Sequence, residues 1–128
     1  MDPLRVLVVE DNPVNRLLAT KSVEKLGHKV ESAANGVEAL QRLREARFDI
    51  VLMDCEMPQM NGYEASSLIR SGTSGVLDST IPIIALTGHD LPEDLERCTA
   101  AGMTSHLSKP FRFDDLAGAI AHSRKSET

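Results

Sequence analysis

The sequence predicts a doubly wound α/β domain, in which helices cover both faces of a parallel sheet. Three nearly continuous apolar runs are typical of strands buried on both faces. Each run is followed by a segment whose apolar residues recur at helical spacing. Strand and helix alternate five times along the 128 residues, which predicts right-handed crossovers within one parallel sheet.

The three buried runs are expected at the centre of the sheet. They extend from Leu4 to Val9, from Ile50 to Met53 and from Ile81 to Leu86. Two weaker candidates, Val30 to Ala34 and Ser105 to Leu107, contain more polar residues. Polar residues are better tolerated at sheet edges, so we expect five strands with these two at the edges.

Five helices are predicted from apolar residues at helical spacing, which mark the faces that pack against the sheet. Pro13 suits the first turn of a helix after Asn12, and Gly27 and Gly102 stand where helices should end. The segment 71–80 lacks such a pattern and is expected to form a surface loop. The apolar sets are Val14, Leu17 and Leu18; Val37, Leu40 and Leu43; Ala65, Leu68 and Ile69; Leu91, Leu95 and Cys98; and Phe113, Leu116 and Ile120.

Length and composition indicate one domain, because 41% of the residues are hydrophobic and can supply a single sizeable core. The net charge of -5 argues against nonspecific nucleic-acid binding. Only two cysteines are present, which favours free thiols in a reducing compartment. No apolar run approaches the roughly 20 residues of a membrane helix. We expect a soluble, cytoplasmic domain at 1–124, followed by a polar tail or linker at 125–128.

Reactive side chains follow the predicted strands at the point where each strand ends. Glu10 and Asp11 follow the first strand, Asp54 the third and Thr87 the fourth, and Lys109 closes the fifth. The carboxyl ends of parallel strands meet at one edge of an open sheet. Three carboxylates, a hydroxyl and an ammonium are therefore expected to converge there.

This set of groups predicts a magnesium ion and a phosphoryl group. Mg²⁺ is bound by few carboxylates together with waters and phosphate oxygens. Asp54 stands apart from the Glu10-Asp11 pair and is the candidate nucleophile, which would form an aspartyl phosphate. Thr87 and Lys109 would contact phosphoryl oxygens. Taken singly, each residue also has a structural interpretation: helix capping, turn capping or surface ion pairing.

Three backbone features are also expected near the site. A cis bond between Lys109 and Pro110 would aim the lysine side chain. Gly62 is expected to take a positive φ near the mouth of the site, and Gly88 to leave room for a phosphodonor.

With these residues in this order, the chain resembles a receiver domain of two-component signalling, the response-regulator family, over nearly its whole length. The matching segments are VVEDNPVN, VLMDCEMPQMNG, PIIALTG and LSKPF. The resemblance implies a flavodoxin-like (βα)5 three-layer sandwich with strand order 2-1-3-4-5. It also implies Mg²⁺ held additionally by the backbone carbonyl of Glu56, and phosphoryl transfer from a phosphohistidine to Asp54 followed by hydrolysis.

The amino-acid sequences of these segments are most similar to those of receivers in hybrid sensor histidine kinases. That similarity implies a histidine kinase and a histidine phosphotransfer domain as partners, and a place in the cytoplasmic part of a membrane-bound kinase. It implies a monomer or a weak, phosphorylation-dependent dimer, with no contact of this domain with nucleic acid or membrane. A free-standing single-domain response regulator is the alternative.

One residue departs from the family pattern. Many receivers place an aromatic residue three positions before the lysine, where it moves inward with the threonine upon phosphorylation; this chain has His106 there. The aromatic half of that switch is missing. Glu56 and His89 occupy positions that tune the phosphoryl lifetime in the family.

The sequence disfavours three other functions. A phosphohydrolase of the haloacid-dehalogenase type would carry two aspartates two apart after the first strand, whereas the acids here are adjacent. We therefore expect no turnover of external substrates beyond slow self-dephosphorylation. A phosphorylation-independent interaction domain would have lost an acid or the lysine, and none is lost. A flavin is disfavoured because the acids after the first strand would repel its phosphate.

Overall fold

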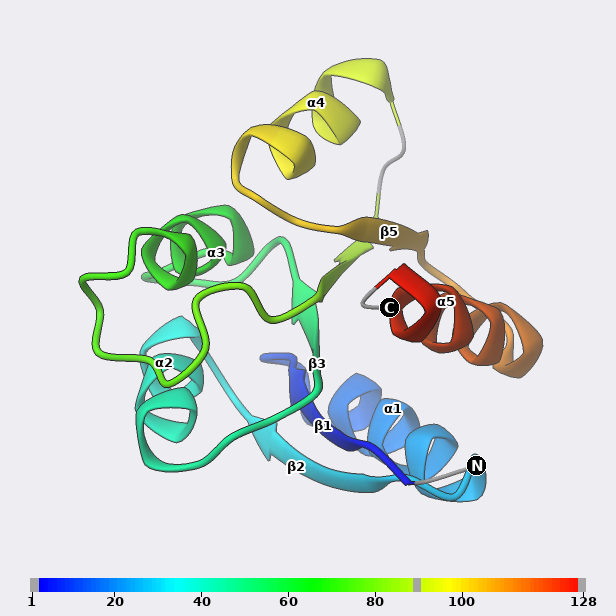
Figure 1. The fold of residues 1–128 in the computed structure, drawn as a ribbon. Coiled ribbons are helices and arrows are strands. Elements are labelled where there is room, and N and C mark those ends of the chain that lie inside the picture. Colours follow the sequence, from blue (N-terminus) through cyan, green and yellow to red (C-terminus); the bar gives the residue numbers. More distant parts are fainter. Residues whose placement is uncertain (1–2, 89–90, 127–128) are drawn as a thin grey trace.

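The fold repeats a strand–helix unit along the chain (Figure 1). A computed structural model describes residues 3–88 and 91–126, with side chains up to Ser123 in the last helix. None of the described helices is both long enough and apolar enough to span a bilayer. The elements are β1 Arg5–Val9, α1 Pro13–Lys25, β2 Lys29–Ala33, α2 Gly36–Glu45, β3 Ile50–Asp54, α3 Gly62–Arg70, β4 Ile83–Thr87, α4 Pro92–Ala100, β5 Ser105–Ser108 and α5 Phe113–Ser126.

All neighbouring strands run parallel, in the order β2-β1-β3-β4-β5. This order and the two edge strands confirm the predicted flavodoxin-like sheet. Val9 of β1 pairs with Met53 of β3, and Asp54 pairs with Leu86 of β4. The registers therefore bring the ends of β1, β3 and β4 together at one edge of the sheet.

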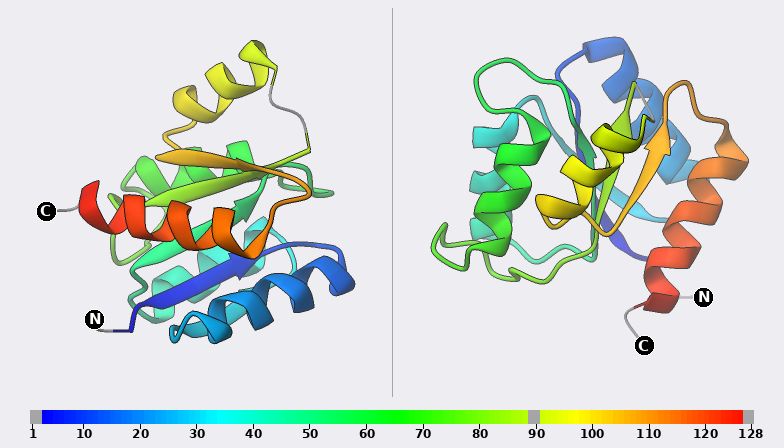
Figure 2. Two further views of the ribbon diagram at one scale, coloured as in Figure 1. Left: turned by 90° about the vertical axis from the view of Figure 1, so that its right-hand side faces the viewer. Right: turned by 90° about the horizontal axis from the view of Figure 1, so that it is seen from above.

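Helices cover both faces of the sheet, so the molecule has three layers (Figure 1). Leu7 and Val9 of β1 pack into a core with α2, α3 and α4, whereas Val6 and Val8 pack into a second core with α1 and α5. The alternation follows from the strand period of two residues. Figure 2 shows that β1 begins and α5 ends at the same end of the molecule, opposite the carboxyl ends of the strands.

The predicted starts and ends of helices are confirmed. The Asn12 side chain accepts hydrogen bonds from the backbone N–H groups of Val14 and Asn15, with Pro13 in the first turn of α1. Gly27 and Gly102 follow α1 and α4 with φ of 94° and 89°. These angles belong to the left-handed region, in which glycine ends helices without a steric penalty.

The face by which α1 packs differs from the prediction. Val14, Leu17 and Leu18 are 65%, 57% and 61% exposed, whereas Ala19 and Val23 are buried. Ala19 and Val23 therefore form the face that packs into the core with β1, and the larger side chains lie on the exposed face of the helix. Apolar spacing identifies a stripe on a helix, but it does not tell whether the sheet or another molecule covers that stripe. Four other residues of the predicted faces are more than a third exposed: Val37, Leu68, Leu91 and Phe113.

The prediction that Gly62 takes a positive φ was wrong. The positive-φ residues among those described do not include Gly62, and the non-glycine residue with a positive φ in this loop is Gln59, at 69°. A Cβ on Gly62 would instead collide with the backbone carbonyl of Asp54 and lie 2.9 Å from the Cα atom of Cys55. Glycine is therefore required because α3 begins against the end of β3.

We predict that Gly62→Ala lowers the free energy of unfolding by about 1–3 kcal/mol, because the added methyl group forces the Asp54 carbonyl and α3 apart. Urea denaturation measures this change. The control is Gly118→Ala in α5, where a Cβ meets nothing within 4 Å. That variant should be neutral or more stable by up to about 1 kcal/mol, because alanine favours helix. Equal stability of Gly62→Ala and the unchanged chain would contradict the steric interpretation.

Candidate functional site

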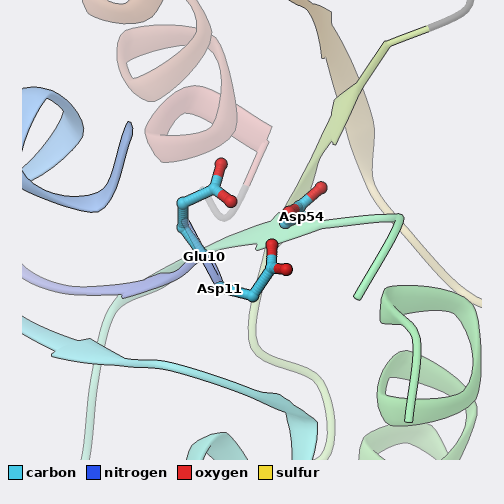
Figure 3. Close-up of side chains that lie close together, drawn as sticks. All are labelled: Glu10, Asp11 and Asp54. Carbon is cyan, nitrogen blue, oxygen red and sulfur yellow. The ribbon is translucent and has the colours of Figure 1, made fainter. Parts of the chain in front are cut away.

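Three carboxylates gather at the carboxyl edge of the sheet. Glu10 and Asp11 follow β1, Asp54 ends β3, and one carboxylate oxygen from each lies within 4.8 Å of the others. Figure 3 shows the three side chains beside the end of β3. They meet because β1 and β3 are neighbours in register, although Asp54 is far from the other two in sequence.

Two of these acids are deeply buried. Glu10 is 2% exposed and Asp54 is 3% exposed, whereas Asp11 is the most accessible of the three. Buried carboxylates are costly unless a cation or hydrogen bonds offset the loss of water. The site must therefore contain compensating positive charge.

Lys109 supplies that charge. Its Nζ donates hydrogen bonds to Glu10 Oε1 at 2.8 Å and to Asp54 Oδ1 at 3.1 Å. The backbone N–H of Lys109 also donates to the carbonyl of Thr87 at 2.6 Å, which fixes the turn after β5. The bond from Lys109 to Pro110 is cis, which confirms the prediction.

The pKa values of Asp54, Glu10 and Lys109 reflect this arrangement. Burial and then the neighbouring Glu10 raise the pKa of Asp54 from 3.8 to about 7, although the Lys109 ammonium acts in the opposite direction. Burial also raises the pKa of Glu10, but hydrogen bonds with Asp54, Lys109 and the Asn12 amide outweigh it, so that pKa is lowered. Burial lowers the pKa of Lys109, yet the two carboxylates raise it overall. The Lys109 ammonium therefore stays protonated, and it donates hydrogen bonds to both Glu10 and Asp54.

Thr87 contributes a buried hydroxyl. The residue is 2% exposed at the end of β4, beside the strand that carries Asp54, and its Oγ1 has no hydrogen-bond partner among the described residues. A buried hydroxyl without a partner is costly and is usually explained by a ligand, an ion or water. Gly88 follows, and a Cβ there would meet nothing within 4 Å, so the position after Thr87 is not crowded by the described residues.

The structure places Glu56 beside the site but on the surface. Its backbone N–H donates to Asp54 Oδ1 at 3.2 Å, and its side chain is exposed. Ligation of a metal by its carbonyl stays a prediction. His106 is exposed on β5 opposite Ala85, and His89 lies outside the described residues.

Two contributors to the site were not predicted from the sequence. The backbone N–H of Asn12 donates to Glu10 Oε2 at 3.2 Å, and Arg16 Nη1 donates to the carbonyls of Glu10 at 3.0 Å and Asp11 at 3.4 Å. The i to i+6 spacing from Glu10 to Arg16 is the only sequence signal for the arginine. Such a spacing is uninformative until the loop conformation is known.

A cavity of about 530 Å³ adjoins the acids on the α1 side. Glu10 and Lys109 are among its polar lining residues, and Leu18 and Phe111 are among its apolar ones. Cys55 is the residue after Asp54. Burial raises the pKa of its thiol to about 12, and the neighbouring Cys98 also raises that pKa. A thiol with so high a pKa is a packing group rather than a nucleophile.

The donor set fits a hard divalent cation. Three carboxylates face one ammonium, so a negative charge remains to be neutralised, and carboxylate oxygens are the ligands that Mg²⁺ prefers. The buried hydroxyl of Thr87 and the ammonium of Lys109 add donors for an anionic group beside the cation. The arrangement suits an ion together with a phosphoryl group more than either alone.

Comparisons with known proteins agree with this geometry. The family model of the response regulator receiver domain matches residues 6–121. The receiver domain of sensor histidine kinase PA1611 from Pseudomonas aeruginosa, solved with a magnesium ion in its active-site cleft, is 37% identical with a TM-score of 0.84; the match covers 94% of this chain and 97% of that one. The chemotaxis protein CheY4 of Vibrio cholerae is 32% identical with a TM-score of 0.87, covering 95% and 99%.

The similar curated proteins are much longer. The sensor histidine kinase RcsC of Salmonella typhi is 39% identical over 120 residues, which cover 94% of this chain and 12% of RcsC. The sensor protein GacS of Pseudomonas syringae pv. syringae is 36% identical over 116 residues, covering 91% and 13%. With the family model matching nearly all of its length and the site built from its strand ends, this chain belongs to the response regulator receiver domain family.

Proposed function

We propose that Asp54 accepts a phosphoryl group from a phosphohistidine in a Mg²⁺-dependent reaction. The observation that supports this most is the buried Asp54 carboxylate, which lies between the Lys109 ammonium and two further acids. Phosphoryl transfer needs charge neutralisation and alignment more than covalent chemistry from the protein. This site supplies both through groups fixed by the sheet.

In the proposed step, an oxygen of Asp54 attacks phosphorus while the bond from phosphorus to the donor imidazole breaks. Oδ1 is engaged by Lys109 and by the Glu56 N–H, which leaves Oδ2 to form the new bond. The electron pair of the broken bond stays on the imidazole. The product is an acyl phosphate on Asp54, which water later hydrolyses.

Glu10, Asp11, Asp54 and the carbonyl of Glu56 would hold the metal. Mg²⁺ would supply positive charge against the phosphoryl oxygens as the group passes between donor and acceptor. The Lys109 ammonium would neutralise one phosphoryl oxygen, because it already lies 3.1 Å from Asp54 Oδ1. The Thr87 hydroxyl would donate to another, which would satisfy its missing hydrogen bond.

We further propose that the domain belongs to a hybrid sensor histidine kinase. The support is its similarity to RcsC and GacS, in which a region of this size is a small part of a longer protein. The proposed partners are a histidine kinase and a histidine phosphotransfer domain, and the proposed place is the cytoplasm. A free-standing regulator remains the second candidate, because the chain also resembles CheY4 over 99% of that protein.

We predict that incubation with acetyl phosphate and Mg²⁺ gives one phosphoryl adduct in the intact mass of the protein, labile to hydroxylamine. Asp54→Asn should lose the adduct, since an amide oxygen is a poor nucleophile and forms no acyl phosphate. A chelator should suppress it in the unchanged chain.

A stable adduct in Asp54→Asn would place the acceptor elsewhere and overturn the proposal. Absence of any adduct under a rapid quench, both from acetyl phosphate and from a phosphorylated histidine phosphotransfer domain, would leave a phosphorylation-independent binding domain.

The exposed face of α1 is the proposed contact for the histidine-bearing partner. Val14, Leu17 and Leu18 form a contiguous apolar stripe, and Leu18 also lines the cavity that Glu10 and Lys109 border. A phosphohistidine must come within bonding distance of Asp54, so the partner has to rest on surfaces around the strand ends. An apolar stripe beside the site fits the apolar face of a partner helix.

We predict that Leu17→Glu slows phosphotransfer at least tenfold when the donor is a purified histidine phosphotransfer domain phosphorylated on its histidine. The reason is that the substitution places a charge in an apolar contact. The rate with acetyl phosphate should stay within twofold, since that small donor needs no helix contact. Radiolabel transfer measures both rates, with a donor domain that phosphorylates the unchanged chain.

The matched control is Leu77→Glu, which changes a leucine that is 44% exposed in the loop before β4. It should leave both rates unchanged. Equal slowing by Leu17→Glu with both donors would argue against a docking role and for damage to the site.

A further inference from the structure

Arg16 reaches from α1 back to the loop that carries two of the acids. Its Nη1 donates to the backbone carbonyls of Glu10 at 3.0 Å and of Asp11 at 3.4 Å. The side chain is partly buried, and the backbone of Arg16 is anchored by a hydrogen bond from its N–H to the Asn12 carbonyl at 2.8 Å. One nitrogen of the Arg16 guanidinium thus links the carbonyls of Glu10 and Asp11 to α1.

The two acids depend on this contact to different degrees. Glu10 is also held by its N–H to the Ala33 carbonyl at 3.1 Å and by hydrogen bonds from Lys109 and the Asn12 amide to its carboxylate. For Asp11, the contact with Arg16 is the only hydrogen bond that the described part of the chain provides. Asp11 is also the most accessible of the three acids.

We propose that Arg16 is a positioning residue for the metal site: it fixes the Asp11 backbone so that the Asp11 carboxylate faces those of Glu10 and Asp54. This inference rests on the proposed Mg²⁺-dependent function. It assigns to Arg16 a role that involves no contact with the ion. Residues that hold metal ligands in place commonly contribute about 10-fold to 100-fold to metal affinity.

Two effects of Arg16 on cation binding have opposite signs. Its positive charge repels a cation, so neutralising it would tighten binding if charge dominated. Its hydrogen bonds align Asp11, so removing them would weaken binding if positioning dominated. Because the guanidinium is partly exposed, solvent and salt screen its charge, and positioning should prevail.

The experiment is calorimetric titration of Mg²⁺ into the unphosphorylated protein. Arg16→Gln should raise the Kd for Mg²⁺ about 10-fold, although it removes a positive charge. Arg16→Lys, which keeps the charge and one donor, should recover part of the affinity. The control Arg47→Gln removes the same charge from an exposed site before β3, at the opposite end of that strand from Asp54, and should leave the Kd within twofold.

Phosphorylation provides a second readout. With acetyl phosphate, the rate for Arg16→Gln should fall at low Mg²⁺ and return to that of the unchanged chain at saturating Mg²⁺. A distorted fold would not be rescued by the ion. An unchanged or lower Kd in Arg16→Gln, or a rate that saturating Mg²⁺ does not restore, overturns the inference.

Asp11→Asn separates this inference from the proposed function. If Asp11→Asn weakens Mg²⁺ binding and Arg16→Gln does not, the metal site stands and the role of Arg16 falls. If Asp11→Asn leaves Mg²⁺ binding unchanged, or the unchanged chain binds no Mg²⁺, the metal site itself is wrong and both proposals fall.

Discussion

The contact of one ammonium with two buried carboxylates is the interaction on which the site depends. Lys109 reaches Glu10 and Asp54 across 99 and 55 residues of sequence, so it joins the last strand to the first and third. Without it, two acids would be buried with no cation, which proteins rarely tolerate. Three carboxylates and one ammonium leave negative charge in excess. A second cation could neutralise that charge. Stability of the carboxyl edge and its chemistry are therefore set by the same charges.

The parallel sheet makes this contact possible at little structural cost. Strands buried on both faces are fixed by their apolar side chains, and Val6 to Val9 and Ile50 to Met53 are fully buried. The polar residues that follow or end these strands lie at the edge of the core, where the loops lead into helices, and Glu10, Asp54 and Thr87 are buried there. Gly62 lets α3 start directly against the Asp54 carbonyl, which keeps the end of β3 close to the helix layer. The three carboxylates thus follow or end strands whose apolar residues are fully buried.

Several features at the carboxyl edge of the sheet are unfavourable for the stability of the folded chain. The Thr87 hydroxyl has no partner among the described residues, the pKa of Asp54 is raised to about 7, and the α1 stripe leaves large apolar side chains in water. Each is explained if another molecule completes the site. The cavity beside Lys109 is lined by Leu18 of the stripe and by Glu10 of the acids, so the proposed partner contact and the proposed phosphoryl transfer would share one region.

Local sequence patterns were sufficient to predict the strands, the helices that connect them and the reactive residues at the strand ends, because buried parallel strands and capped helices have strong local patterns. The segments around Asp54 and Lys109 also indicated the family, and with it the strand order. Three features could not be predicted without the packing of the elements: which face of α1 is buried, why position 62 needs glycine, and that Arg16 donates a hydrogen bond to the Asp11 carbonyl. These features depend on distances between elements. Local spacing constrains which residues share a face, but the close approach of separate elements determines what each face meets.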